Sequence, residues 1–574
     1  RFSGLPFEDR RKCIEGWRTG ALWGRPVFGA LKELSTLAWY TQPVSWSAIG
    51  YTGPLVPPTA QRGWTDADHR YASLPIHTHK SGPGDGSTVK AKAVVIGSGA
   101  GGAAAAYALA RRGMEVAVVE AGSFHLPREL SQREEEMYPR LFYDAGGRRT
   151  ANRAIRVLHG HGVGGSTLHN INLCKRVPDA LLEEWKLPGW SPHEFKPYLD
   201  EIERLLEVRP VDLAMVNTAN ALIRKGVGAL GWKGGILHHN RRGCVGSGFC
   251  ELGCSFDAKL NAARVLIPDA VAKGATVYAD TRALRFDVAG GRVQGLTVRT
   301  QAPAWSGGGP AREWRLEADL YICAGGAVET PLLLERSGAP DPHGRLGRGL
   351  RLHPGAAVAG LFDQNVRCWQ GIPQSWECTE WLSFEPGSSK RTWIVGGSAH
   401  PAGAASFLPG YGAAHAELMT HYPRLVPLSA MLHDRTQGRV GGTAGGGVEL
   451  DYVLDEGDRA ELARGLQACA RILFAAGARE VWVPTREVLR LKSVAEVDRM
   501  PQRLADGDID LVAVHPMGSV PMGTDPRTSG CGPDQKFHGL ENLWIADASV
   551  YPTSLGVPPQ ISTYSVGLRV GRQV

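Results

Sequence analysis

The amino-acid sequence predicts an α/β protein of two or three domains, one of them with a Rossmann-type dinucleotide-binding core. A chain of 574 residues is too long for one ordinary hydrophobic core. Residues 93–120 read as strand, glycine turn, helix and strand in succession. After residue 355 the composition changes to tryptophans, prolines and glycines with a helix-like stretch at 459–475, which indicates a second, substrate-facing domain.

The dinucleotide-binding unit begins with a strand at 93–96 and continues through Gly97-Ser-Gly99-Ala-Gly-Gly102, a helix at 103–112 and a strand at 115–119 that ends at Glu120. Gly97 permits the tight turn, Gly99 lets the backbone approach a pyrophosphate, and Gly102 lets helix and strand pack closely. The helix N-terminus favours phosphate, and Glu120 can accept hydrogen bonds from ribose hydroxyls. Because this carboxylate would repel a 2′-phosphate, the pattern disfavours NADP and leaves FAD or NAD.

A second glycine-dense loop, Gly160-His-Gly-Val-Gly-Gly-Ser-Thr-Leu-His-Asn170, favours FAD. Such a loop lets the backbone come close to a flat, polar ligand. This fits the isoalloxazine ring better than a small nicotinamide, and a plain structural loop is the alternative interpretation. Further apolar runs predict strands at 276–278, 294–298 and 320–323.

Charge and composition argue against several other functions. The net charge is only +7, with 64 basic residues interleaved among 57 acidic ones, so we expect no nucleic-acid partner. No apolar run reaches the ~18–20 residues of a transmembrane helix. Ten cysteines are too sparse for a disulfide scaffold, which favours a reducing, cytoplasmic compartment. The chain begins at Arg1 without a signal-peptide pattern, so processing upstream stays open.

Residues 1–80 are predicted to form an N-terminal helical arm. Apolar residues from Leu22 to Ala38 recur at helical spacing, and Gly53-Pro54 and Pro57-Pro58 end the segment. We expect the arm to pack on the main body, because few cations flank its apolar face. Docking to a partner protein or to a membrane surface is the alternative.

Four ordered motifs make the chain resemble the glucose–methanol–choline (GMC) flavin oxidoreductases from about residue 90 onward. After the βαβ unit, the loop at 160–170 resembles the first family signature apart from its two histidines, His161 and His169. Residues 326–338 resemble the second signature, although Ala339-Pro340 follows. The segments beginning at His515 and Asp547 match the C-terminal family region. The arm and residues 347–354 are similar to the long-chain alcohol oxidase branch, which acts on lipophilic alcohols.

The resemblance implies a Rossmann-type FAD-binding domain and a substrate domain built on a mixed sheet. We expect the main part of the FAD-binding domain at 90–354, the substrate-binding domain at 355–505, and a C-terminal return to the FAD-binding domain, with the catalytic segment, at 506–574. The resemblance places FAD contacts at Gly97, Gly99, Gly102, Glu120, Gly164, Gly165, Asn170, Leu284, Asp547 and Ala548.

The implied reaction is FAD-dependent oxidation of a lipophilic or bulky alcohol to a carbonyl, with oxygen or another electron acceptor as the second partner. A neutral imidazole suits removal of the hydroxyl proton, so His515 is predicted to be the base. The family has a second His or Asn where this chain has Pro558, whose side chain cannot exchange a proton. Either Gln560, Ser562 or His353 replaces it, or one histidine acts alone. A biosynthetic desaturation or oxidative rearrangement is the alternative reaction.

Cys244, Cys250 and Cys254 form a close group in a glycine-loosened loop. Three thiolates could hold a three-iron iron–sulfur cluster, and the spacing is similar to that of the flavin glucose dehydrogenase branch. It does not match the two-residue spacing of zinc sites. Against the cluster, family members without one also carry cysteines here, and residues 257–259 read as a plain helix start. A flavin/iron–sulfur electron-transfer subunit is therefore a further alternative function.

Overall fold

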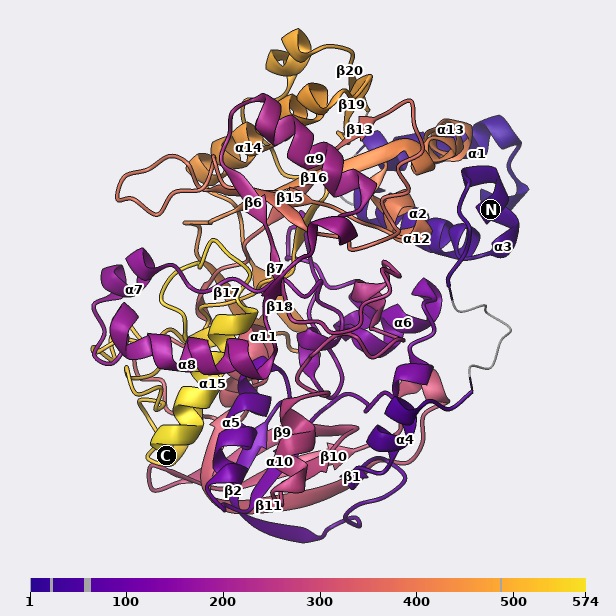
Figure 1. Cartoon of the computed structure of the whole chain (residues 1–574). Helices are drawn as coiled ribbons and strands as arrows, with labels where there is room; N and C mark the ends of the chain where they lie inside the picture. Colours follow the sequence, from indigo (N-terminus) through magenta and orange to yellow (C-terminus); the bar gives the residue numbers. More distant parts are fainter. Residues whose placement is uncertain (1, 21–23, 56–62, 486–487) are drawn as a thin grey trace.

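A computed structural model describes residues 2–20, 24–55, 63–485 and 488–574 of the chain. Figure 1 shows two sheet-containing bodies, one above the other, with the N-terminal helices beside the upper one. The predicted turn at Pro57-Pro58, and Leu22 of the predicted helix, lie outside the described residues.

The lower body in Figure 1 is built on an eight-stranded sheet. From one edge to the other its strands are β1 (Ile76–His77), β8 (Thr276–Tyr278), β3 (Val116–Val119), β2 (Thr88–Ile96), β11 (Arg312–Cys323), β10 (Arg292–Thr300) and β9 (Thr281–Ala289), and β22 (Leu543–Ile545) also pairs with β11. The strands from β1 to β11, and β22, pair in parallel, whereas β9 and β10 add an antiparallel edge. This confirms the predicted Rossmann-type core.

The register of the parallel strands brings the segments of the site to one edge of this sheet. Ile96 pairs with Val119 on one side and with Cys323 on the other, and Cys323 also pairs with Ile545. Four strands therefore end at the same level, and the loops that follow them meet there. Ligands of open α/β sheets bind outside the carboxyl ends of the strands.

Three helices pack together beside this sheet. They are α5 (Ala100–Arg111), α10 (Leu266–Ala272) and the C-terminal α15 (Gln560–Gln573), and both α10 and α15 contact α5. α5 consists mostly of alanine and glycine and is buried from Gly101 to Ala110. These small side chains let the neighbouring helices approach its backbone. Figure 1 shows α15 (yellow) running beside α5, so that the last segment of the chain closes onto the first βαβ unit.

The upper body is built on a nine-stranded, mainly antiparallel sheet. Its strands are β20 (Leu489–Leu491), β19 (Glu480–Val483), β13 (Gly355–Leu361), β16 (Leu425–Leu432), β15 (Thr392–Gly396), β14 (Trp376–Cys378) and β6 (Gly234–Ile236), with β21 (Leu511–Ala513) joined to β13 and β4 (Ile155–Val157) to β21. The predicted boundary at residue 355 coincides with the start of β13. The predicted segments are not separate in space, however, because β4, β6 and β21 join this sheet from outside 355–505.

Helices α14 (Glu456–Ala476) and α9 (Thr218–Ala229) pack together over the upper sheet. α14 covers the predicted stretch 459–475; the Asp455 side chain caps its N-terminus, and Gly477 ends it with φ of 103°. Smaller elements complete the fold: α6 (Glu134–Leu141), α7 (Asp179–Trp185), α8 (Pro192–Leu205), α11 (Gly326–Arg336), α13 (Gly412–Thr420), β12 (Arg348–Leu350), β17 (Gly438–Gly442), β18 (Val448–Asp451), β5 (Arg209–Pro210) and β7 (His238–His239).

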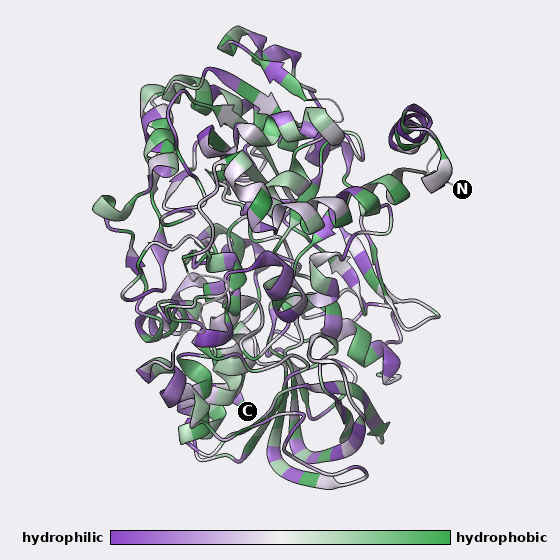
Figure 2. Cartoon of the chain, turned by 90° about the vertical axis from the view of Figure 1, so that its right-hand side faces the viewer, coloured by the Kyte–Doolittle hydropathy of each residue, from purple (hydrophilic) through white to green (hydrophobic). Residues whose placement is uncertain are grey.

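The N-terminal arm contains α1 (Phe7–Thr19), α2 (Gly24–Tyr40), α3 (Pro43–Trp46) and α4 (Asp66–Ala72). α2 packs on α12 (Pro401–Phe407), and its Glu33 forms ion pairs with Arg149 and Arg156 at 2.5 Å. In Figure 2 the helix next to the N label stands away from the body, in keeping with an α1 that buries none of its residues. In the described part of the chain, no helix is long and apolar enough to cross a membrane.

Candidate active site

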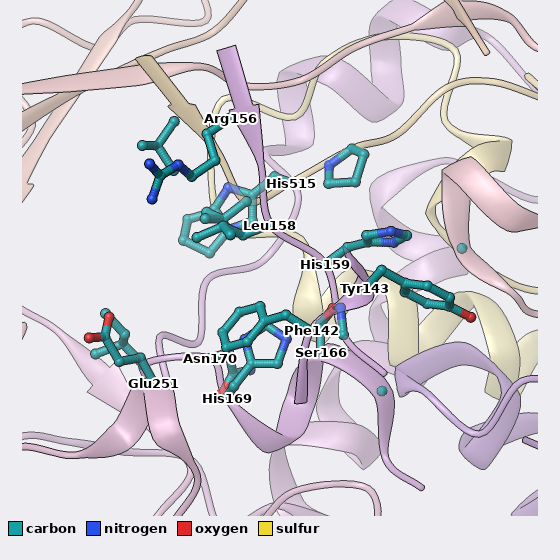
Figure 3. Close-up of a pocket in the computed structure, with 18 of the residues that line it drawn as sticks. Phe142, Tyr143, Arg156, Leu158, His159, Ser166, His169, Asn170, Glu251 and His515 are labelled. Atoms are coloured by element: carbon teal, nitrogen blue, oxygen red, sulfur yellow. Dashed lines mark hydrogen bonds between the residues drawn. The ribbon is translucent and has the colours of Figure 1, made fainter. Parts of the chain in front are cut away.

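A cavity of about 560 Å³ connects the two bodies. At one end it is lined by Gly97, Gly99 and Glu120 at the carboxyl edge of the Rossmann sheet. It continues past Gly165 and Asn170 to His515, and from there along the upper sheet. Figure 3 draws His515, Asn170 and Glu251 around this space. The cavity therefore contains a nucleotide-binding end and a region beyond His515.

Three glycines of the two predicted glycine loops have packing roles that only a glycine can fill. A Cβ on Gly97, where φ is 99°, would lie 2.3 Å from the Ala324 carbonyl oxygen. A Cβ on Gly102 would lie 1.9 Å from the carbonyl oxygen of Gly97. Gly165 faces Gly99, and a Cβ on Gly165 would lie 2.8 Å from the Gly99 Cα atom. The two glycine loops thus touch through bare backbone. Gly102 and Gly164 support these loops without lining the cavity.

Glu120 is buried and holds the first turn in shape while it lines the cavity. The Ser98 amide and hydroxyl donate to one of its carboxylate oxygens at 3.0 and 2.7 Å, and the Gly122 amide donates to the other at 2.9 Å. A carboxylate has about four lone-pair sites, so acceptor capacity remains for the hydroxyls of a ribose.

Asp547 joins the C-terminal segment to the start of α11. Its carboxylate accepts hydrogen bonds from the Gly326 amide at 2.9 Å, the Thr330 hydroxyl at 2.6 Å and the Ser549 amide at 2.8 Å. Burial raises the pKa of this carboxyl, and its hydrogen bonds oppose that shift. Asp547 and Ala548 both line the cavity.

The predicted cofactor contact Leu284 directly follows residues that line the cavity. The cavity is lined by Thr281, Arg282 and Ala283 of β9, and Leu284 is not part of that lining. The Leu284 carbonyl instead accepts a hydrogen bond from Arg336 Nε at 3.4 Å. Leu284 lies at a register shift of the strand pair, because Thr297 pairs with Arg285 and Val298 with Ala283.

Asn170 and Gln560 link the second glycine loop to α15. The Asn170 amide donates to Gln560 Oε1 at 2.8 Å, and Gln560 Nε2 donates to the Leu173 carbonyl at 2.5 Å. Both ends of the Gln560 amide are therefore engaged by protein groups, although the side chain lines the cavity. Gln560 fits a bridging role better than proton transfer. Ser562 is fully buried and accepts from the Val177 amide at 2.9 Å, away from the cavity.

Lys259, whose role sequence analysis missed, binds the backbone of the second glycine loop. Residues 257–259 do not begin a helix, because α10 starts only at Leu266. The buried Lys259 ammonium donates to the carbonyls of Leu168 at 2.9 Å, Cys250 at 2.8 Å and Asn170. Burial lowers the pKa of Lys259. No local pattern reveals this role, because it depends on carbonyls that lie far away in the sequence.

His515 follows β21 and reaches the cavity, whereas His353 lies directly behind it. Their Nδ1 atoms are 2.9 Å apart, so one imidazole donates to the other. Burial lowers the pKa of His515 to about 3, and burial together with the neighbouring histidines lowers that of His353 well below its usual value. Both rings are therefore neutral near pH 7. His353 is fully buried and does not line the cavity. It can orient His515 but does not reach a substrate.

The backbone fixes this histidine pair from both sides. Arg351 and Met517 exchange amide-to-carbonyl hydrogen bonds of 2.8 and 2.9 Å, which align the two histidine segments. The buried Asp434 carboxylate accepts from the His353 amide at 3.2 Å and from the Tyr452 hydroxyl at 2.6 Å. His353 has φ of 53°, a left-handed conformation that is uncommon for a residue other than glycine. Strain of this kind is held in place by the surrounding contacts.

Pro558 lines the same cavity as His515. It is buried and immediately precedes Pro559, which caps α15. Two consecutive prolines give the segment fixed φ values, so the chain enters α15 with little freedom. Pro558 contributes shape to the site but no proton-exchanging group.

The cysteine group does not support an iron–sulfur cluster. In the described ranges, no set of three or more His, Cys, Asp or Glu side chains is arranged to hold a metal ion. Cys244, Cys250 and Cys254 line a cavity of about 20 Å³, which has room for only about one water molecule. Burial also raises the pKa of the Cys250 thiol to about 12, which opposes the thiolate that a cluster requires.

Comparison with known proteins agrees with this geometry. Models of the N- and C-terminal parts of the GMC oxidoreductase family match residues 138–355 and 444–567, and an NAD(P)-binding Rossmann-like model matches 95–125. The chain belongs to the GMC oxidoreductase family. An uncharacterised GMC-type oxidoreductase of Mycobacterium tuberculosis is 34% identical over 471 residues, or 81% of this chain and 72% of the relative. Long-chain-alcohol oxidase FAO1 of Arabidopsis thaliana is 26% identical over 640 residues, 100% of this chain and 81% of the relative.

Solved structures have the same fold at lower identity. Pyridoxine 4-oxidase from Mesorbium loti superposes with a TM-score of 0.64 at 19% identity, covering 84% of this chain and 99% of that one. Formate oxidase of Aspergillus oryzae, a protein with a modified FAD, gives a TM-score of 0.62 at 16% identity, covering 85% and 98%. GMC oxidoreductases bind FAD, and the touching glycine loops, Glu120 and the long cavity fit that cofactor.

Proposed function

We propose that the protein oxidises a lipophilic alcohol to the corresponding carbonyl compound, with His515 as the base. The observation that carries the proposal is a neutral, oriented imidazole that lines the cavity at the junction of its nucleotide-binding end and its apolar region. FAD, when bound, would accept the carbinol hydride and later pass the electrons to oxygen or another acceptor.

The hydrogen bond between His515 and His353 is compatible with two tautomers, and the proposed base role requires one of them. For His515 Nε2 to accept a proton, its Nδ1 must carry the hydrogen and donate to His353 Nδ1. His353 is then protonated on Nε2, which is buried and has no hydrogen-bond partner within the described ranges. In this state the His515 Nε2 lone pair faces the cavity and can take the hydroxyl proton as the C–H hydride leaves. His353 holds the ring in place as a positioning residue.

The walls beyond His515 support a lipophilic substrate. They include the apolar side chains of Leu158, Phe407, Leu408, Leu425, Trp482 and Val512. Pockets with this character bind ligands mainly by burial of apolar surface. The long-chain-alcohol oxidase relatives of Arabidopsis thaliana, at about 26% identity, support the same substrate class.

The test is anaerobic bleaching of the FAD-loaded protein by alcohols of graded chain length. We expect the wild-type protein to bleach and His515→Ala to retain FAD but lose bleaching, by roughly 100-fold or more in rate. His193→Ala, a change at an exposed histidine of α8, is the matched control and should behave as the wild type. Full activity of the His515→Ala protein would disprove the assignment.

A second candidate is desaturation or oxidative rearrangement in a biosynthetic reaction, and Pro558 favours it because a proton-exchanging group is missing at that wall. If no alcohol of the series bleaches the wild-type FAD, the proposal of alcohol oxidation fails and this second reaction gains support.

A further inference from the structure

A polar corner interrupts the apolar part of the cavity. Glu251, in the 3₁₀ turn Cys250–Leu252, lines the cavity, and so does Tyr138 of α6, the helix that packs on this turn. Figure 3 places Glu251 at the side of the cavity away from His515. The corner is therefore separate from the histidine pair but faces the same space.

The half-buried Glu251 carboxyl differs from that of the buried Glu134 nearby because it lacks protein partners. Glu134 accepts hydrogen bonds from the Ala402 and Gly403 amides at 2.8 and 2.7 Å, and so caps α12. In the described part of the chain, the Glu251 carboxyl and the Tyr138 hydroxyl have no hydrogen-bond or ion-pair partner. Both side chains are half-buried and line the cavity, so a ligand that fills the cavity would remove them from water and would have to supply their hydrogen bonds.

The protonation of this corner determines which ligand it suits. Burial raises the pKa of Glu251 to about 8; the Glu134 charge adds to the shift and Lys259 opposes it. Burial and the nearby carboxylates also raise the pKa of the Tyr138 hydroxyl well above its usual value. At neutral pH both groups therefore carry their protons and can donate hydrogen bonds. Their complement is an oxygen atom that accepts.

We propose that Glu251 and Tyr138 form a subsite for a second oxygen function of the substrate, a hydroxyl or carbonyl remote from the carbinol that is oxidised. The proposal rests on the proposed function for the position of the carbinol at His515. The substrate would then be a lipophilic alcohol with two oxygen functions, one bound near His515 and the other at Glu251 and Tyr138.

The experiment compares 1-alkanols with α,ω-diols of the same chain length across a series of lengths. For the wild-type FAD-loaded protein, we expect one length of diol to exceed its 1-alkanol in kcat/KM by roughly 3- to 10-fold, the effect of one or two hydrogen bonds. Glu251→Met, which keeps the side-chain length without the hydrogen bonds, should bring this ratio close to two, the statistical factor for a diol with two equivalent ends. Glu251→Gln should keep most of the wild-type preference, and Tyr138→Phe should lower it in part.

Glu184→Met, at an exposed glutamate of α7, is the matched control and should leave the ratio as in the wild type. A diol-to-alkanol ratio no higher than the statistical factor at every chain length in the wild type, or the same preference in Glu251→Met, would overturn the subsite. Binding of matched mono- and diketones, followed by the shift of the flavin absorption band, gives a readout without turnover. If no alcohol reacts, the proposal of alcohol oxidation fails. The subsite is then still tested by ketone binding: the wild type should bind the diketone more tightly than the monoketone, and Glu251→Met should lose this preference.

Discussion

At the scale of single residues, the site depends on one hydrogen bond between two neutral imidazoles. His515 faces the cavity and His353 is buried behind it, with 2.9 Å between their Nδ1 atoms. In the proposed mechanism, His353 supports His515 where the side chain of Pro558 cannot. The second histidine acts on the orientation and tautomer of the first, because the cavity does not reach it.

Replacing His353 should therefore affect the chemical step more than binding. We expect His353→Ala to lower kcat by roughly 10- to 100-fold, because small displacements of a reacting group are costly, with little change in KM. His353→Asn should be milder, since Asn tolerates the φ of 53° and its amide oxygen can accept from His515. Steady-state kinetics with FAD content measured in each variant provide the check. Equal loss in both variants, or a change in KM alone, would contradict the positioning role.

At the scale of elements, two helices that are far apart in the sequence, α5 and α15, pack with their backbones in close approach. A Cβ on Gly567 of α15 would lie 1.9 Å from the Gly101 carbonyl oxygen of α5, and one on Gly101 would lie 1.7 Å from the Ala546 carbonyl oxygen after β22. Three segments thus meet at Gly101. Gln560, at the start of α15, accepts a hydrogen bond from Asn170 of the second glycine loop. The position of this helix therefore also influences the position of that loop in the cavity.

Gly567→Ala should push α15 away from α5. We expect a loss of about 1–3 kcal/mol in the free energy of unfolding from overpacking, together with weaker retention of FAD. Gly228→Ala is the control, because this helical glycine of α9 has no atom within 4 Å of an added Cβ; it should be neutral or stabilise by about 0.5–1 kcal/mol. Urea unfolding and the FAD content of the purified variants test both. A Gly567→Ala protein as stable as the wild type would contradict the prediction, because it would show that α15 can move away from α5 without loss of stability.

At the scale of the whole molecule, buried ionisable groups predict a stability maximum near pH 6.5. Burial lowers the pKa of many of the described histidines; for five of them it falls to about 4 (His125, His400 and His433) or to about 3 (His169 and His515). Unfolding below about pH 6.5 lets them take up protons, so stability falls as the pH drops. Burial raises the pKa of Glu134 to about 7 and of Glu251 to about 8. Unfolding lets them release protons, so stability also falls as the pH rises toward 8.

In the pH range where both kinds of group titrate on unfolding, the histidines outnumber Glu134 and Glu251. Stability should therefore fall more steeply on the acid side of the maximum than on the alkaline side. Thermal unfolding midpoints measured between pH 4.5 and 8.5 at constant ionic strength provide the test. Glu134→Gln should flatten the alkaline side, because the neutral amide no longer titrates. A midpoint that rises steadily up to pH 8.5 would contradict the prediction.

The whole fold also shows where sequence reasoning succeeds and where it stops. The βαβ unit was predictable because its strand, glycine turn, helix and terminal Glu120 are consecutive. Strands β4, β6 and β21 have three residues each and are set by distant partners, so they carry no usable local period. The roles of Lys259, Glu251 and His353 likewise depend on tertiary packing. Leu284 stays a prediction as a cofactor contact, and it lies at a register shift between β9 and β10 that no local sequence pattern reveals.

The meeting of α15 with α5 also has a consequence for the order of events during synthesis. Gly97 to Glu120 is made more than four hundred residues before Asp547 and Gln560, which line the same cavity. A nascent chain can fold its early segments as they appear, yet it cannot enclose a flavin until translation of this region is finished. Loading of FAD therefore requires a chain whose synthesis has passed α15, and a chain cut short before α15 would remain colourless.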